Sequence, residues 1–515
     1  MSTSSHAGWV LPESRVRGAA TSVAAVERWR RALWMATPFF TGAVVMAQEL
    51  VAFRLYAPYF GYSIYVWGSM ISVVMAALAL GYAIGGWAAD RSDGDVPLYG
   101  TVLGSAIYQV VILYVVSSLL RFFADMDESV GTALASLIVF GPPMTAMAMA
   151  CPYLIRLQSR AGGVGLAAGR VYGVSTVGSI AGILGTSFYL VPHFGTHKTL
   201  EAICVLSAVT GAAGLALHFR PALFGVVAVL LLLMFAPLSN WRGGTVWAAE
   251  SAYNLVRVVR SGDWLLLKLN DGGGVHTMRN RRSEFTGHYY DDFALGPLLS
   301  PAKHLLVLGM GGGGSIAATR MAAPQVDVDA VEIDAKVVEA SQRFFGVDAS
   351  DKKLHVYVAD ARPWLARSRS SYDLVHVDLY QGGPYIPFYL MTVEFFEMVR
   401  GHMSQQGVLM MNLFDISPTQ ELLTPTVATL RRVFPSVEVL SVGHGNRMLL
   451  AFAQQTSASE IRARLESFRG GVAIRDLARR AASQIADFGV AEGTAVFTDD
   501  WAPVEEITRR MLRGE

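Results

Sequence analysis

Several positions in the second half of the chain combine the residue types and the spacing of a site for an adenosine-bearing ligand. Gly309, Gly311 and Gly313 follow an apolar, strand-like run and precede a helical pattern. A glycine turn at this place lets a ligand approach the backbone of a doubly wound α/β sheet. Glu332 closes the next expected strand, where a carboxylate can accept both hydroxyls of a ribose.

Asp360 and Ala361 close the third expected strand, where the carboxylate is placed to accept a hydrogen bond from an adenine amine. Because the carboxyl ends of parallel strands meet at one edge of a sheet, these residues and the glycine turn converge on one crevice. The pattern predicts an adenosine site. The alternative is a purely structural fold, since glycine-rich runs also occur in simple loops.

Asp378 closes the fourth expected strand, ahead of a glycine- and proline-containing loop with Tyr380 and Tyr385. A carboxylate in this setting can act as a base, anchor a cationic acceptor and lie under a mobile lid. The alternative is an aspartate that caps a helix or a turn.

Regular alternation of strand-like and helical segments would position these side chains. We expect strands at 304–309, 326–333, 354–358, 373–378, 407–413 and 437–442, and helices near 313–323 and 335–345. This order predicts a parallel, doubly wound Rossmann-like domain at 301–455, followed by a C-terminal helical tail at 456–515. Before it, residues 241–300 predict a small β-hairpin lobe, with two β runs joined at Ser261–Asp263, a turn at Asp271–Gly274 and a linking helix at Glu284–Leu299.

The composition of the chain indicates a membrane protein. Of its 515 residues, 52% are hydrophobic and only 16% are charged, and the mean hydropathy is +0.38. We expect a disordered basic tail at 1–31 that ends in a short helix, and an α-helical transmembrane bundle at 32–240. Apolar stretches long enough to span ~30 Å of hydrocarbon recur at about 33–53, 64–89, 98–121, 130–156, 168–192, 200–218 and 222–238.

Orientation raises a conflict between two arguments. Arginine-rich segments before the first stretch and after the second and fourth favour a cytoplasmic location for those ends. Seven spans would then leave the carboxy-terminal half outside, where a cytoplasmic nucleoside cofactor is absent. We therefore expect one stretch to be re-entrant, split or not spanning, with 130–156 and 222–238 the weakest, and the α/β half to be cytoplasmic.

Other functional classes have little support. A formal net charge of +1, without a basic stripe, gives no argument for binding nucleic acid. Cys151 and Cys204 lie in apolar stretches without metal-ligand spacing, so we interpret them as packing residues and expect no metal.

The run from Glu250 to about Phe452 resembles spermidine synthase, an aminopropyltransferase family. The matching residues are Glu250–Asn254, Asp271–Gly272, Glu284–Phe285, His288, the glycine turn, Val331–Asp334, Asp360 and Asp378. The membrane half, with Gly81–Arg91 and Gly169–Gly178, and the run Thr498–Pro503 are similar to bacterial members fused to a membrane domain. The resemblance implies a multi-pass protein in the lipid bilayer of the bacterial inner membrane. We also expect a homo-oligomer.

This resemblance implies transfer of an aminopropyl group from decarboxylated S-adenosylmethionine to an amine or polyamine, with release of methylthioadenosine. A sulfonium is already a good leaving group, whereas an ammonium acceptor must lose a proton before its lone pair attacks; Asp378 would be the base. The glycine turn, Glu332, Asp360 and Ala361 would hold the nucleoside. His276 stands where the family has a glutamine near the donor. The acceptor side would comprise His288, Tyr253, Tyr380 and Gln381, and either histidine is alternatively a surface residue.

Three departures from the family leave the substrates open. The aspartate that grips the donor's amino group is replaced by Gly312, the second aspartate of the acceptor site by Gln381, and a tyrosine by Gly287. Fewer carboxylates weaken the case for a doubly charged polyamine. Two alternatives therefore remain: transfer of a methyl or other alkyl group from S-adenosylmethionine itself, and a polyamine transporter or sensor whose α/β domain only binds ligand.

Overall fold

The computed structural model describes residues 13–61, 63–92, 94–160, 162–219, 221, 223–234, 243–270, 274–443, 445–485 and 488–513. The chain divides into two compact units. The first comprises Met1–Tyr56 and Ile64–Asn240 and is helical; the second comprises Ala57–Ser63 and Trp241–Glu515 and is an α/β unit. The division after Asn240 coincides with the expected start of the lobe.

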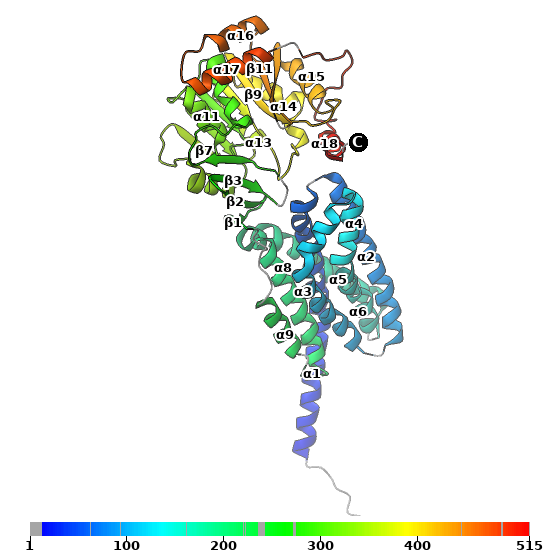
Figure 1. The fold of residues 1–515 in the computed structure, drawn as a ribbon. Helices are drawn as coiled ribbons and strands as arrows, with labels where there is room; N and C mark the ends of the chain where they lie inside the picture. The colour runs from blue at the N-terminus through cyan, green and yellow to red at the C-terminus, as the bar shows by residue number, and fades with distance from the viewer. Residues whose placement is uncertain are drawn as a thin grey trace, which may run out of the picture. The chain divides into compact units, whose positions relative to one another are not determined.

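Long helices make up the first unit (Figure 1). They are α1 (Glu13–Phe60), α2 (Ile64–Arg91), α3 (Val96–Ala124), α4 (Glu128–Val139), α5 (Gly141–Ala148), α6 (Ala150–Ser159), α7 (Val164–Gly185), the π-helical turn η1 (Thr186–Leu190), α8 (Val191–Ala216) and α9 (Leu223–Met234). α1 begins well inside the predicted disordered tail 1–31, which contains an alanine-rich run that favours helix.

The apolar stretches correspond to fewer long helices than the seven candidates. Within the part of the chain that the structure describes, four helices could cross a bilayer by length and composition: Val26–Phe60, Ile64–Arg91, Val96–Ala124 and Val164–Ala216. The last joins two predicted stretches and leaves helical conformation at Gly195, where φ is +78°. A fifth candidate is the pair of helical segments Glu128–Val139 and Gly141–Ser159, whose axes differ by 52°. Pro142 and Pro143 lie at the start of the second segment, directly after this bend. α9 has 12 residues, fewer than the ~20 of a typical span.

Close helix packing in the first unit depends on glycine. Gly178 and Gly182 of α7 face α1 so closely that a Cβ atom would overlap the carbonyl oxygens of Phe39 and Ala43, respectively. Small residues that let helix backbones approach in this way are typical of membrane bundles, where no hydrophobic effect drives helix association. Gly173, on the same helix, has no atom within 4 Å of the position of its Cβ.

The α/β unit begins with a four-stranded antiparallel sheet in the order β1 (Thr245–Glu250), β2 (Leu255–Ser261), β3 (Trp264–Leu269) and β4 (Thr277–Asn280). The predicted hairpin is β2–β3, in which Ser261 pairs with Trp264. β1 and β4 were not predicted, and the predicted turn Asp271–Gly274 lies outside the described residues except for Gly274.

The linking helix predicted at Glu284–Leu299 is wrong in its first part. The structure has a 3₁₀-helix, η3 (Tyr289–Leu295), and a short α10 (Gly296–Leu299). Gly287 has a φ of +75°, and the Asp291 carboxylate accepts hydrogen bonds from the backbone N–H groups of Thr286 and Gly287. These bonds hold the preceding residues as a turn, which a helix would break.

A seven-stranded sheet forms the body of this unit, in the order β10-β11-β9-β8-β5-β6-β7. Its strands are β5 (His304–Leu308), β6 (Asp327–Glu332), β7 (Leu354–Val358), β8 (Tyr372–Val377), β9 (Met403–Phe414), β10 (Ser436–Gly443) and β11 (Asn446–Phe452). The first five are parallel, as predicted, whereas β10 and β11 add antiparallel strands at one edge. β11 was missed by the sequence interpretation.

Helices cover both faces of this sheet (Figure 1). One face packs against α13 (Ala361–Leu365), η5 (Phe388–Leu390), α14 (Val393–Gly401), α15 (Leu423–Val433) and α18 (Val504–Arg513). The other packs against η3, α10, α11 (Gly314–Ala322), α16 (Ala458–Ser467) and α17 (Val472–Gln484), while α12 (Ala335–Ala340) and the π-helical turn η4 (Ser341–Phe345) pack mainly against the lobe. The predicted C-terminal tail is therefore part of the sheet's two cores, and Asp499 within it forms an ion pair with Arg362 of α13.

Substitution of Gly178 by alanine should destabilise the first unit, because the added Cβ atom overlaps the backbone of α1. Overpacking typically costs roughly 1–3 kcal/mol. Gly173→Ala is the matched control: it makes the same change in helix propensity on the same helix but adds no overlap. Thermal denaturation of the purified protein in detergent should show a lower midpoint for Gly178→Ala alone. Equal midpoints for the two variants would contradict the packing.

Candidate functional site

A cavity of about 90 Å³ lies where β5, β6, β7 and β8 end, and we name it the central cavity. Most of the predicted site residues line it: Tyr253, His276, Gly309, Gly311, Glu332, Asp360, Ala361, Asp378, Tyr380 and Gln381. Tyr253 and His276 come from the lobe, whereas the others follow the parallel strands, whose ends bring distant parts of the sequence to one edge.

The glycine turn follows β5 and has the backbone conformation that the sequence predicts. Gly309, Gly311 and Gly313 have φ values of +84°, +51° and +81°, a region that favours glycine. Gly309 also passes so close to the backbone of Asp378 that a Cβ atom would overlap the Asp378 carbonyl oxygen. Gly313 is the exception among the three, because it lines a different cavity.

Glu332 joins the glycine turn to the end of β6. Its Oε2 accepts a hydrogen bond from the backbone N–H of Gly311 at 3.0 Å, and its Oε1 accepts from that of Asp334 at 3.1 Å. Burial raises the pKa of Glu332 to about 7, against the lowering effect of these hydrogen bonds. Each carboxylate oxygen keeps a second lone-pair direction, which suits two vicinal hydroxyls.

Asp360 is the N-cap of α13 as well as a cavity residue. One carboxylate oxygen accepts from the backbone N–H of Arg362 at 3.1 Å, and the other accepts from the hydroxyl of Tyr389 at 3.2 Å. Both oxygens therefore have a protein donor already, so the carboxylate is fixed in orientation.

Asp378 lies between two side chains from other segments. The hydroxyl of Tyr289 donates to its Oδ2 at 3.0 Å, and the amide of Asn412 donates to its Oδ1 at 3.1 Å. Burial raises the pKa of Asp378 to about 6, and the two hydrogen bonds oppose that rise. A carboxyl group with a pKa in this range is ionised at neutral pH yet basic enough to take a proton.

Other predicted residues have more specific placements. The hydroxyl of Tyr380 donates to the carbonyl of Asn412 and accepts from the backbone N–H of Phe414, so Tyr380 presents its ring to the cavity. Burial lowers the pKa of His276 to about 4, which leaves a neutral imidazole, and its buried Nε2 has no hydrogen-bond partner among the described residues. His288 precedes η3 and is not among the described residues that line the central cavity.

Sequence reasoning missed Tyr289 and Asn412, the two partners of Asp378. Asn412 carried a usable signal, since it is a polar residue within the apolar run of β9, where a buried amide needs a partner. Because β8 and β9 are parallel and pair Val377 with Met411, Asn412 lies beside Asp378. Tyr289 carried no such signal, because the sequence interpretation placed it within a helix and did not predict the turn that precedes it.

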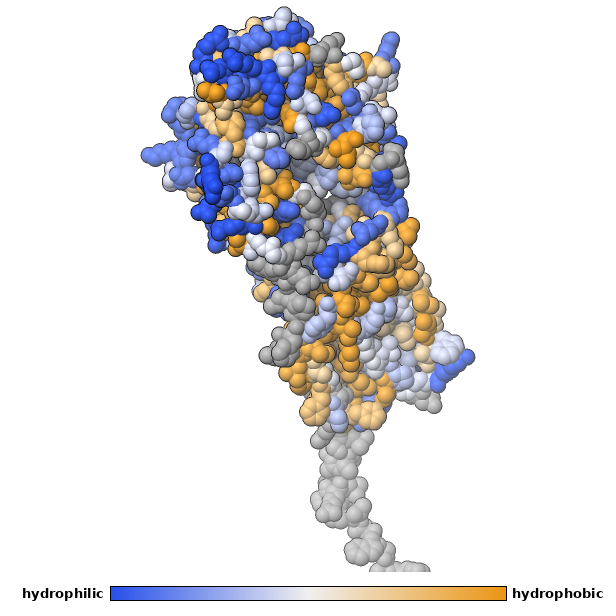
Figure 2. Space-filling model, in the orientation of Figure 1, coloured by the Kyte–Doolittle hydropathy of each residue, from blue (hydrophilic) through white to orange (hydrophobic). Residues whose placement is uncertain are grey.

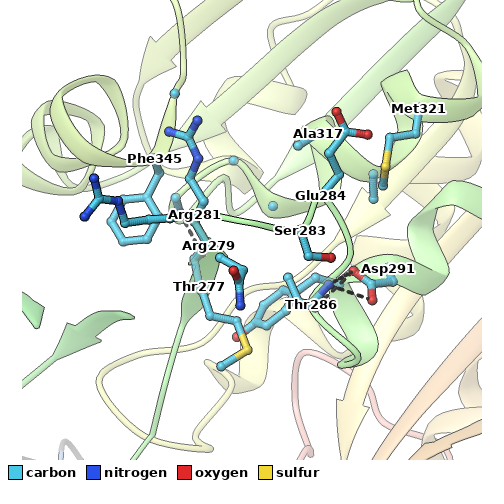
Figure 3. Close-up of a pocket in the computed structure, with 18 of the residues that line it drawn as sticks. Thr277, Arg279, Arg281, Ser283, Glu284, Thr286, Asp291, Ala317, Met321 and Phe345 are labelled. Carbon is cyan, nitrogen blue, oxygen red and sulfur yellow. Dashed lines mark hydrogen bonds between the residues drawn. The ribbon is translucent and has the colours of Figure 1, made fainter. Parts of the chain in front are cut away.

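A second cavity, of about 460 Å³, lies between β4 and the start of α11 (Figure 3). Figure 3 shows Arg279 and Arg281 beside Phe345, and the carboxyl groups of Glu284 and Asp291 elsewhere on the wall. Although larger, it holds charges of both signs, and Asp291 is bonded to its own turn. Its groups do not converge on one point, so we place the functional site in the central cavity.

The partition between the two cavities is a contact between strand β4 and the glycine turn. Thr277 Oγ1 accepts a hydrogen bond from the backbone N–H of Gly312 at 2.8 Å. A Cβ atom on Gly312 would lie 2.7 Å from Thr277 Cγ2 and 3.1 Å from the ring of Phe345. No side chain fits at position 312 without displacing Thr277.

Among the described residues, no three His, Cys, Asp or Glu side chains cluster in a metal-binding arrangement.

The sheet order, the glycine turn, Glu332 and Asp378 make up an α/β domain with a cavity at the ends of its parallel strands. Within it, residues 293–443 match the family model described as "Spermine/spermidine synthase domain". The matched residues all lie within the second unit.

Several known proteins are similar to parts of this chain. A "Probable polyamine aminopropyl transferase" of Bifidobacterium longum is 31% identical over 242 residues, which is 46% of this chain and 50% of that protein. A "Polyamine aminopropyltransferase" of Vibrio vulnificus is 28% identical over 233 residues, 43% of this chain and 76% of that protein. The chain thus spans about half the length of the first of these relatives.

Methyltransferases also match, over a shorter stretch. The "eEF1A lysine and N-terminal methyltransferase" of Homo sapiens is 29% identical over 164 residues, 30% of this chain and 23% of that protein. Among solved structures, a probable spermidine synthase from Corynebacterium glutamicum is 20% identical, with 48% of this chain and 97% of that chain covered and a TM-score of 0.37.

Replacement of Glu332 by glutamine should weaken binding of methylthioadenosine, an adenosine-bearing ligand, by about tenfold or more, since hydrogen bonds to a charged group are worth about 1.5–3 kcal/mol. The unchanged protein should lose affinity as pH falls below about 7, the pKa of Glu332, because the protonated carboxyl accepts less well. Glu332→Gln should remove that pH dependence. Glu339→Gln, on the exposed side of α12, is the control. Calorimetry that finds the same affinity and pH profile for Glu332→Gln would exclude Glu332 from the site.

Proposed function

We propose that the chain is a membrane-anchored aminopropyltransferase of the spermidine synthase type. It would transfer an aminopropyl group from decarboxylated S-adenosylmethionine to an amine and release methylthioadenosine. The observation that carries this proposal is the partly buried Asp378, held by Tyr289 and Asn412 in the same cavity as the ribose-binding candidate Glu332.

The chemistry requires a base but no acid. The acceptor nitrogen gives its proton to Asp378, and its lone pair then attacks the aminopropyl carbon next to the sulfonium. The carbon–sulfur bond breaks, and its electrons neutralise the sulfur as the thioether leaves. Tyr289 and Asn412 hold the carboxylate so that one lone pair of each oxygen remains for the acceptor.

The donor would lie along the strand ends. Glu332 would accept the ribose hydroxyls, and Asp360 and Ala361 would border the adenine. The donor's aminopropyl tail would pass His276, whose unpartnered Nε2 would accept from its ammonium in the neutral tautomer that carries its proton on Nδ1. Position 312 offers no carboxylate for this purpose, and Thr277 fills the space that such a side chain would need.

The helical unit would anchor the enzyme in a lipid bilayer. Supporting this are the long apolar helices and the apolar surface that the visible face of this unit presents in Figure 2. The exposed apolar side chains of α2 include Met75, Leu80 and Ile84. We place the protein in the inner membrane of a bacterium, with the α/β unit on the cytoplasmic side, and as a homo-oligomer. Recovery of the full chain in the soluble fraction without detergent would argue against this placement.

Methyl or alkyl transfer from intact S-adenosylmethionine is the second candidate. It is favoured by Gly312, which leaves the donor tail without a carboxylate, and by the similarity to methyltransferases. The products distinguish the two reactions: methylthioadenosine reports aminopropyl transfer, and S-adenosylhomocysteine reports methyl transfer.

The variant Asp378→Asn should lower kcat by about 10²–10⁴-fold, the usual contribution of a general base. Binding of methylthioadenosine should persist, since the hydroxyl of Tyr289 can turn to accept from the new amide. Mass spectrometry of the products and calorimetry of the ligand are the two measurements. Asp263→Asn, in the β2–β3 turn, should keep the rate. Unchanged turnover in Asp378→Asn would show that Asp378 is not the base, whereas no product from the unsubstituted protein would leave the transporter or sensor hypothesis ahead.

The acidic limb of the pH–rate profile should report the ionisation of Asp378. At saturating donor, kcat/KM for the acceptor should rise with pH, with a midpoint near 6, because the base must be ionised. Tyr289→Phe removes a hydrogen bond that lowers this pKa, so the midpoint should move up by about one unit. Tyr357→Phe is the control, since Tyr357 is exposed on β7 and its hydroxyl donates to Asp329 rather than to Asp378. An unmoved midpoint in Tyr289→Phe would refute this role.

A further inference from the structure

Negative charge in the central cavity is sparse. Among the described residues that line it, the acidic side chains are Glu332, Asp360 and Asp378, and none is Lys or Arg. Under the proposed function the first two serve the nucleoside. Asp378 is then the single carboxylate on the acceptor side.

The donor already brings two positive charges to this cavity, a sulfonium and an ammonium. The ammonium has a neutral acceptor in His276 Nε2, and the nearest carboxylate to the reacting centre would be Asp378. A diamine acceptor would add a second ammonium beyond the one that Asp378 deprotonates. A buried cation without a paired anion loses its hydration without compensation.

Among the described residues, the cavity wall beside Asp378 has few groups that could stabilise a second ammonium. Leu379, Pro387 and Leu390 are apolar. Tyr380 directs its hydroxyl into β9, where two backbone groups already bond it. The tyrosine rings can attract a cation through their faces, but this attraction is weaker than a paired carboxylate.

Gln381 is the polar side chain that the loop after Asp378 adds to the cavity. Its backbone is fixed, because its N–H donates to the carbonyl of Tyr385 and its carbonyl accepts from the N–H of Gly383. An amide at this fixed place can bond a neutral or polar group but supplies no charge. A carboxylate here would be the missing second anion.

We infer that the acceptor is a primary amine with one positive charge and an uncharged, largely apolar remainder, in place of a diamine. This inference rests on the proposed function and names the substrate class of that site. Such an amine is available in two forms, a short soluble alkylamine or a long-chain amine held in a bilayer, and both present the same group to Asp378.

The test compares n-pentylamine with 1,4-diaminobutane, which have the same length and differ in a terminal methyl or ammonium group. Purified full-length protein is given decarboxylated S-adenosylmethionine, and methylthioadenosine release is followed. We expect kcat/KM at least about tenfold higher for n-pentylamine. Dodecylamine in phosphatidylcholine vesicles forms a second arm, and a further gain there would identify the bilayer as the source. A preference for the diamine would overturn the inference and leave the proposed function intact.

Binding gives a readout that does not need turnover. Calorimetry of both amines on protein saturated with methylthioadenosine should again favour n-pentylamine. Tighter diamine binding would overturn the inference, whereas monoamine preference without any product formation would support it and count against the proposed reaction.

A gain-of-function variant sharpens the test. Gln381→Asp should shift the ratio of the two amines toward the diamine by about tenfold or more, because it adds the second anion. Gln381→Asn shortens the side chain equally without adding charge, so its ratio should stay on the side of the monoamine. The same ratio in both variants would show that charge at position 381 does not select the acceptor.

Discussion

The hydrogen-bonded carboxylate of Asp378 is the constraint on which the α/β unit's site depends. An ionised group in this buried position needs compensating donors, and they come from two separate segments, Tyr289 of η3 and Asn412 of β9. Strand β8, the 3₁₀-helix and the neighbouring strand must therefore keep their register for the site to exist. Removing either donor would leave a buried charge less compensated, which is a larger effect than loss of an ordinary surface contact.

Close backbone approach is the second constraint, and it accounts for the glycines. Gly309 lies against the backbone of Asp378, and Gly312 lies against Thr277. The first contact brings the glycine turn next to the proposed base. The second closes the central cavity toward β4. The same packing leaves no room for a side chain at position 312, so that position cannot supply a carboxylate to the tail of the proposed donor.

The sequence predicted those strands that a local pattern of apolar residues marks. Apolar runs that end in Gly309, Glu332 and Asp378 gave strands β5, β6 and β8 within a residue or two of their observed bounds. Carboxylates at strand ends were then brought together by the parallel topology. The prediction lost accuracy just before Tyr289, where hydrogen bonds from the backbone of Thr286 and Gly287 to the Asp291 side chain replace the start of the expected helix with a turn.

Hydrogen bonds also link the proposed donor and acceptor sides of the central cavity. Asp334, two residues after Glu332, accepts hydrogen bonds from Ser251 and Asn254 of the β1–β2 connection. The side-chain carbonyl of Asn254 accepts from the amide of Asn270, which in turn lies against Gly382 in the loop after Asp378. Gly382 has a φ of +65°, and a Cβ atom there would overlap the Asn270 amide, so the loop after Asp378 packs directly on this chain of amides. The hydrogen bonds of the lobe therefore support both the strand end that carries Glu332 and the loop after Asp378, which gives these polar contacts a role in ordering both halves of the cavity.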